Sequence, residues 1–148
     1  IRAVRERISL PLVANGDCAS ADDAREMMSR SGADAVMVGR GAYGRPWLPG
    51  AIAAELDGLP APDVPSGAAL GELVCEHVEM MRELYGVQKG LRLARKHIAW
   101  YLDAGAAAVP GEVRQKILTS EDAGFVAASL RACFAGEPET VSSLEAAA

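Results

Sequence analysis

The sequence has few cysteines and no long apolar run, and both absences exclude whole classes of protein. Its three cysteines, Cys18, Cys75 and Cys133, are far apart and form no C-x-x-C pair, which argues against a disulfide framework and a zinc site. No segment approaches the roughly 18 to 20 consecutive apolar residues that a membrane helix needs. We therefore expect a cytoplasmic protein without a bound metal.

The sequence also lacks an initiating methionine. It begins at Ile1 and soon enters an apolar, strand-like segment, so we interpret it as a fragment of a longer chain. Its net charge of −5 argues against a general attraction to nucleic acid. Between residues 82 and 101, however, five basic residues stand against one acidic residue, a local net charge of +4.

The first third of the sequence predicts a parallel α/β unit. Residues 8–14 form an apolar strand, and the helix that follows has Ser20 as its N-cap and Gly32 as its C-terminal stop. A second apolar strand covers residues 35–38. A strand, a helix and a strand within about 30 residues indicate a βαβ unit with parallel strands. A further helix is expected over residues 47–56.

The remainder of the sequence predicts a second domain made of helices. Residues 58–67 are rich in proline and glycine and form the expected linker after an α/β part over residues 1–57. A helical domain over residues 68–136 follows, with helices at 68–85, 89–103, 110–118 and 121–134, the last capped by Thr119 or Ser120. The small and polar residues 137–148 predict a disordered tail.

Two glycine-bearing segments, residues 11–17 and 34–41, each place a polar or glycine turn directly after an apolar strand. Turns at the carboxyl ends of parallel strands present backbone N–H groups to phosphate, and in eight-stranded α/β barrels the turns after the last two strands commonly do so. Glycines let the backbone approach the phosphate, and an arginine binds it with two hydrogen bonds. The candidate cofactor-binding residues are Asn15, Gly16, Asp17, Gly39 and Arg40. Taken singly, each segment is more typical of an ordinary turn, but the two together, at this spacing, favour a shared phosphate site.

The predicted helix 89–103 has one basic face and one apolar face. At 100° per residue, Lys89, Arg92, Lys96 and Trp100 fall on one stripe, opposite apolar residues that would pack. Basic side chains bind RNA phosphates, and an aromatic ring stacks on an unpaired base. Arg95, at the edge of the apolar face, is a further RNA-binding candidate or an ion-pair partner within the bundle. The alternative interpretation of the whole stripe is a solvated helix face.

Three blocks of the sequence together resemble bacterial tRNA-dihydrouridine synthases of the DusB type. Residues 11–47 carry N-G-D, then G-A-D-A-V-M-V-G-R-G-A and G-R-P-W, and they resemble the end of the flavin-binding barrel. Residues 77–85 (HVEMMRELY) and 89–102 (KGLRLARKHIAWYL) resemble the helical tRNA-binding region. The resemblance extends to about residue 134 and implies the last two strand–helix units of a TIM-type (β/α)8 barrel, followed by an all-α bundle.

This resemblance implies an enzyme that uses FMN and NADPH to reduce uridine in tRNA to 5,6-dihydrouridine. It also implies that Asn15, Gly16, Asp17, Gly39 and Arg40 contact the FMN phosphate and its surroundings, that tRNA is the partner, and that the full-length protein is a monomer. The proton-donating cysteine of the family stands in an Asn-x-x-Cys-Pro motif, which is absent here. We therefore assign no catalytic residue to this chain, Cys18 included, and expect the fragment alone to be inactive.

Two other interpretations stay open from the sequence. One is a different phosphate-binding barrel oxidoreductase, such as a relative of dihydroorotate or inosinate dehydrogenase. The other is a non-catalytic RNA-binding module with a truncated barrel attached. Of the two histidines, His77 favours a structural role, while His97 suits either RNA contact or a packed hydrogen bond.

Overall fold

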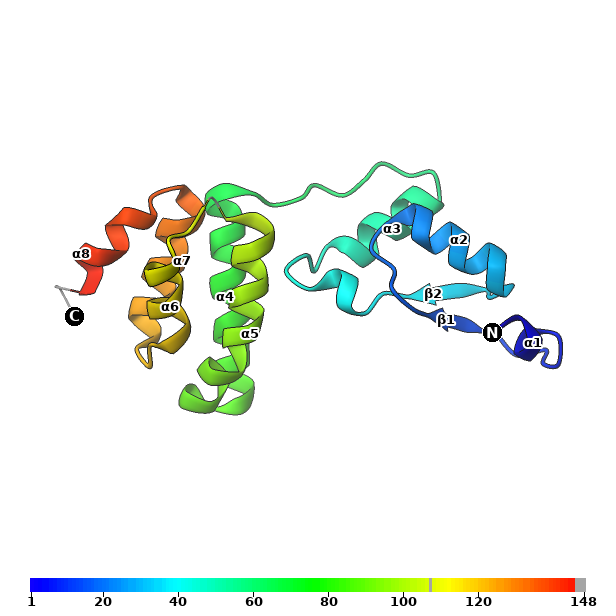
Figure 1. The fold of residues 1–148 in the computed structure, drawn as a ribbon, viewed down its shortest axis with the longest axis horizontal. Coiled ribbons are helices and arrows are strands. Elements are labelled where there is room, and N and C mark those ends of the chain that lie inside the picture. Colours follow the sequence, from blue (N-terminus) through cyan, green and yellow to red (C-terminus); the bar gives the residue numbers. More distant parts are fainter. Residues whose placement is uncertain (107, 146–148) are drawn as a thin grey trace. The chain divides into compact units, whose positions relative to one another are not determined.

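The computed structural model describes residues 1–106 and 108–145, which divide into two units, Ile1–Val64 and Pro65–Ala148. The division falls inside the proline-rich segment between the α/β and helical parts (Figure 1). Within the described ranges, no helix is both long enough and apolar enough to cross a membrane.

The first unit is built around two parallel strands and the helix that connects them. Strand β1 (Val13–Asn15) pairs with β2 (Ala35–Met37), with Val13 opposite Ala35 and Asn15 opposite Met37, and α2 (Ala21–Ser31) connects them. The predicted βαβ unit is thus confirmed. After β2 come a short 3-10 helix, η1 (Arg40–Ala42), and then α3 (Leu48–Leu56). Cys18, Ala21, Ala24, Leu48 and Ile52 form the core of this unit.

The caps of α2 follow the sequence signals. The Ser20 hydroxyl accepts a hydrogen bond from the Asp23 N–H at 3.1 Å, and the Asp23 carboxylate accepts one from the Ala19 N–H at 2.9 Å. The first bond satisfies an N–H group that the helix start leaves without a partner, and the second ties the residue before the cap to the first turn. Gly32 ends the helix with φ of 70°, a left-handed conformation that favours glycine.

The beginning of the first unit differs from the prediction. The strand expected over residues 8–14 is reduced to Val13–Asn15, and a short helix, α1 (Arg2–Arg5), precedes it. The Asp34 carboxylate accepts hydrogen bonds from Arg5 at 3.0 Å and from the Leu12 N–H at 2.8 Å. A strand needs a partner for its backbone groups, and in the described part of the chain β1 pairs with β2 over three residues alone.

The second unit is a helical bundle centred on an antiparallel pair. Helices α4 (Gly67–Tyr85) and α5 (Val87–Gly105) are joined at Gly86, where φ is 86°, and α7 (Ala123–Ala135) packs on α4 beside them (Figure 1). Helix α6 (Gly111–Thr119) contacts both α5 and α7. The fold prediction, an α/β part with two parallel strands followed by a helical bundle, is confirmed.

Two details of the bundle correct the sequence-based assignment. Asp122 caps α7, because its carboxylate accepts hydrogen bonds from the N–H groups of Gly124 at 2.7 Å and Phe125 at 3.1 Å. The predicted caps Thr119 and Ser120 lie before it. Residues expected to be disordered form η2 (Pro138–Thr140) and α8 (Val141–Glu145), and the fully buried Val141 side chain anchors them on the bundle. Residues 146–148 of that predicted tail lie outside the described ranges.

Candidate functional site

The turns after β1 and β2 form one pocket. It has a volume of about 440 Å³ and is lined by Asn15, Gly16, Asp17, Gly39, Arg40 and Tyr43. All five residues predicted to bind the cofactor therefore line the same cavity, although up to 25 positions separate them along the chain. Tyr43, which the sequence prediction missed, also lines this pocket and is half exposed. Tyr43 stands three residues after Arg40, just past η1, and this short spacing was the one sign in the sequence that it could reach the pocket.

The parallel register explains how the two turns meet. Asn15 and Met37 are paired at the ends of their strands, so the segments that follow the two strands leave the sheet at the same edge. The turns then come into direct contact at Gly41, because a Cβ built on this residue would lie 2.1 Å from the Cys18 carbonyl oxygen. This close packing between the two turns by itself requires a glycine at position 41. A Cβ on Gly39, in contrast, would meet open space.

Arg40 and Asp17 join the two turns across the pocket. The Arg40 Nη2 atom donates a hydrogen bond to Asp17 Oδ1 at 2.6 Å, while both side chains remain largely exposed, at 75% and 85%. Ion pairs that water reaches contribute little to stability. Guanidinium has five N–H donors, so this contact leaves donors for a bound anion.

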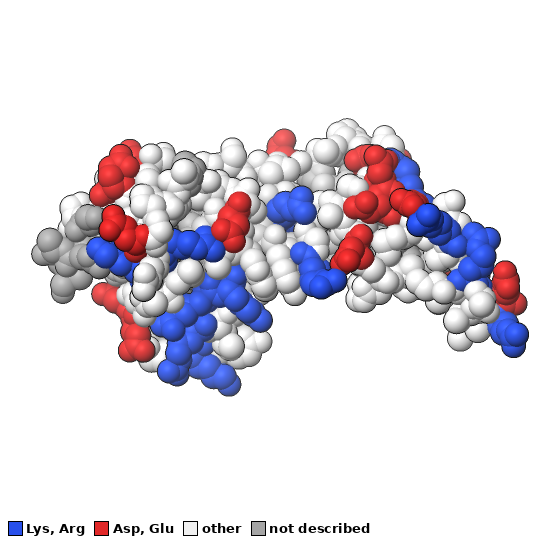
Figure 2. Space-filling model, in the orientation of Figure 1, with Lys and Arg blue, Asp and Glu red and all other residues white. Residues whose placement is uncertain are grey.

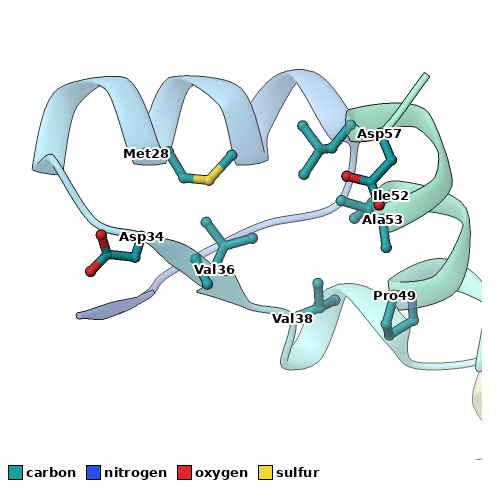
Figure 3. A pocket seen from close by; sticks show the side chains of 10 residues that line it. Met28, Asp34, Val36, Val38, Pro49, Ile52, Ala53 and Asp57 are labelled. Atoms are coloured by element: carbon teal, nitrogen blue, oxygen red, sulfur yellow. The ribbon is translucent and has the colours of Figure 1, made fainter. Parts of the chain in front are cut away.

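A second cavity of about 520 Å³ in the first unit has a different chemical character. It lies between α2, β2 and α3 and is lined mainly by apolar side chains, among them Met28, Val36, Val38 and Ile52 (Figure 3). Its charged lining residues, Asp34 and Asp57, are both acidic. This groove is therefore unsuited to a phosphate, in contrast to the pocket that contains Arg40.

The second unit carries the predicted basic stripe on α5. Lys89, Arg92 and Lys96 are exposed, whereas Leu91, Ala94 and Ile98 on the opposite face are buried. Lysine and arginine side chains gather at the end of this unit where α4 and α5 join (Figure 2). Trp100 is half-buried, with the Lys96 Nζ atom 6.0 Å from its ring centroid.

Arg95 lies apart from this stripe. Its Nη2 atom donates hydrogen bonds to the backbone carbonyls of Thr119 at 3.1 Å and Ser120 at 3.3 Å, at the end of α6. A helix end leaves such carbonyls without partners inside the helix, and a cation near them is favourable. Of the two roles considered for Arg95, this geometry supports the one within the bundle, with backbone carbonyls as partners in place of an acidic side chain.

Both histidines lie between α4 and α5. His77 Nδ1 is 3.1 Å from the Tyr101 hydroxyl, and the His77 and His97 rings are 5.2 Å apart. Burial lowers the pKa of His77, and burial followed by the charges of His77 and Lys96 lowers the pKa of His97. No group of three or more His, Cys, Asp or Glu side chains suited to a metal occurs among the residues described.

The Cys18 thiol is buried beside the pocket. Burial, followed by the nearby Asp23 carboxylate, raises the pKa of this thiol above its usual value. A thiol must lose its proton to act as a nucleophile, and this environment disfavours the thiolate form of Cys18.

A parallel βαβ unit with a pocket at the carboxyl ends of its strands is an arrangement that many α/β proteins use to bind phosphate groups. Comparison with known proteins narrows this class. The sequence matches the family described as Dihydrouridine synthase (Dus) over residues 1–135, and the chain belongs to this family. Its members are flavin oxidoreductases that modify tRNA.

Individual relatives agree with this membership. The chain is 47% identical over 130 residues to the probable tRNA-dihydrouridine synthase of Rhizobium leguminosarum bv. phaseoli, covering 88% of this chain and 39% of that protein. It is 44% identical over 134 residues to the probable tRNA-dihydrouridine synthase of Rhodobacter capsulatus, covering 90% and 40%. With tRNA-dihydrouridine synthase B of Escherichia coli K12 it shares 41% identity over 135 residues, covering 90% and 41%. The chain thus spans about two fifths of the length of these curated relatives.

Proposed function

We propose that this chain supplies the FMN-phosphate site and the tRNA-binding helices of a tRNA-dihydrouridine synthase. The observation that carries the proposal is the single pocket shared by Asn15, Gly16, Asp17, Gly39 and Arg40. Membership of the Dus family supports the proposed reaction, the reduction of uridine to 5,6-dihydrouridine in tRNA, for which we propose NADPH as the reductant.

The chemistry of the pocket suits a phosphate monoester. Arg40 carries a permanent positive charge, and its planar group matches two phosphate oxygens. The open space at Gly39 leaves room for the phosphate to reach the backbone, and the Asn15 side chain adds an amide donor. Asp17 is the one acidic residue in the lining, and its contact with Arg40 keeps the guanidinium over the cavity.

When bound, FMN supplies the hydride that reduces the uracil C5–C6 bond. The residues of this chain would anchor the phosphate end of the cofactor and thereby fix where its ring lies. The Asn-x-x-Cys-Pro motif that provides the proton donor in the family is absent from this sequence. We therefore infer that residues 1–148 alone bind FMN and tRNA but do not catalyse the reaction.

The basic stripe on α5 supports tRNA as the partner of the helical unit. Lys89, Arg92 and Lys96 occupy one exposed face of a protein whose net charge is negative, so the positive charge is local. Phosphate contacts of this kind orient a nucleic acid without reading its sequence. A uridine must leave the base stack to reach a flavin. Contacts between the helical unit and the tRNA body would hold the tRNA in place during that step.

Complementation with the complete gene tests the proposal. We expect the gene, expressed in a strain that lacks its own dihydrouridine synthases, to restore dihydrouridine in tRNA, and the purified protein to carry a yellow chromophore. An Arg40→Ala variant should lose both, while an Arg7→Ala variant, altered at a residue outside the pocket lining, should keep both. A protein that folds and carries flavin but leaves tRNA unmodified would refute the proposed reaction.

A further inference from the structure

An exposed aromatic side chain lies at the junction of α4 and α5. Tyr85, the last residue of α4, is 46% exposed, and its neighbours Leu84 and Val87 are 74% and 56% exposed. Within the part of the chain that the structure describes, the Tyr85 side chain makes no hydrogen bond and no ring contact. Tyr101, in contrast, is buried and forms a hydrogen bond with His77.

Tyr85 ends α4, and the last turns of α4 pack against the start of α5, where the basic stripe begins. A Cβ on Gly90 would lie 2.5 Å from the Arg82 Cα atom, so the first turn of α5 packs directly against the last turn of α4. Lys89 is therefore held beside the segment that ends in Tyr85, and Arg92 follows one turn along α5. Both basic side chains are exposed, and neither forms an ion pair among the described residues.

Trp100, the aromatic residue predicted to stack on a base, is already engaged within the fold. Its ring packs edge-on against His97 with centroids 5.1 Å apart, lies near Lys96, and is half-buried. A base that stacked on it would have to compete with these contacts. Tyr85 has no such contacts to displace.

We propose that Tyr85 stacks on an unpaired base of the tRNA while Lys89 and Arg92 hold the adjacent phosphates; this inference rests on the proposed function. An aromatic ring beside basic side chains is the common pattern of single-strand recognition. The same apolar surface could instead contact a protein, but lysine is depleted at protein interfaces. The charge therefore favours RNA.

The test is the affinity of the 148-residue chain for a fluorescein-labelled tRNA transcript, measured as a function of salt concentration. We expect Tyr85→Ala to weaken binding about tenfold, the size of one lost base stack, with the salt dependence unchanged. Tyr85→Trp should retain binding, and Tyr85→Leu, which stays apolar without an aromatic face, should weaken binding about as much as Tyr85→Ala does. Lys89→Gln should reduce the slope against log salt concentration by about one.

A matched control is Leu84→Ala, which removes the more exposed apolar neighbour of Tyr85. We expect it to bind tRNA like the wild type, and thermal unfolding should show that all variants fold. Equal losses for Leu84→Ala and Tyr85→Ala would indicate an apolar docking surface for protein and overturn the inference, as would an unchanged Tyr85→Ala. If the wild-type chain itself shows no salt-dependent tRNA binding, the proposed role of the helical unit fails, and the stacking inference fails with it.

Discussion

Arg40 and Asp17, which are 23 residues apart in the sequence, form an ion pair of 2.6 Å between the two turns that follow the parallel strands. The pair holds a guanidinium over a cavity whose other lining residues leave space for an anion. It is exposed on both sides and therefore contributes little to folding. A role in binding explains its position better than a role in stability.

Replacing Arg40 should separate binding of the phosphate from binding of the flavin ring. We expect Arg40→Gln in the complete protein to weaken FMN binding about 10- to 100-fold, because a charged hydrogen bond to phosphate is lost. The affinity for riboflavin, which lacks the phosphate, should be unchanged. Fluorescence titration with both flavins measures the difference, and equal losses for the two would argue against a phosphate contact.

Two glycines that follow β2, Gly39 and Gly41, should respond differently to an added methyl group. Gly41→Ala would place a Cβ 2.1 Å from the Cys18 carbonyl oxygen, so we expect the first unit to lose about 1–3 kcal/mol of stability. Gly39→Ala meets open space and should fold normally, with any loss confined to FMN binding. Urea unfolding followed by Trp47 fluorescence in a Trp100→Phe background reports on the first unit. Equal stability for the two variants would contradict the packing described for Gly41.

Substitutions of Arg95 and Arg92 should have different effects: the first should lower stability, and the second should weaken RNA binding. Arg95→Gln removes the donor to the carbonyls at the end of α6, so its main effect should be a lower melting temperature. Arg92→Gln alters an exposed side chain, so it should leave melting unchanged and reduce the salt slope of tRNA binding by about one. Thermal unfolding and binding titrations decide the matter, and the reverse pattern would place Arg95 at the RNA surface.

Acidification should destabilise the helical unit through its two histidines. Burial lowers the pKa of His77 and of His97, and for His97 the charges of His77 and Lys96 add to this effect. In the unfolded chain both imidazoles titrate near 6.5, so the unfolded state takes up protons first as the pH falls. The stabilising effect of the neutral rings is thus complete above about pH 6.5 and is lost as the pH falls through their folded-state pKa values.

Urea unfolding between pH 7.5 and pH 5 measures this dependence. His97→Gln should make the fall in unfolding free energy shallower, since one of the two titrating groups is removed. A wild-type stability that rises on acidification, or a variant with an unchanged slope, would contradict the assignment.

Local signals in the sequence predicted much of this fold. Ser20 and Gly32 marked the two ends of α2, because capping chemistry depends on neighbouring residues alone. The alternation of apolar and basic residues along α5 likewise predicted which face is buried. The cap of α7 was placed too early, because Thr119, Ser120 and Asp122 are all suitable capping residues and the geometry of the preceding turn selects among them.

The sequence by itself determined the strand–helix–strand order of the first unit, five residues that line one pocket and the basic face of α5, because each depends on residue type and spacing. Tertiary structure alone decided that Tyr43 lines the pocket and that the Cys18 carbonyl leaves no space for a side chain at Gly41. Tertiary structure likewise decided that Arg95 donates to the carbonyls at the end of α6. It also decided that Trp100 packs on His97 while Tyr85 remains exposed. These outcomes depend on contacts between segments distant along the chain, which no local pattern encodes.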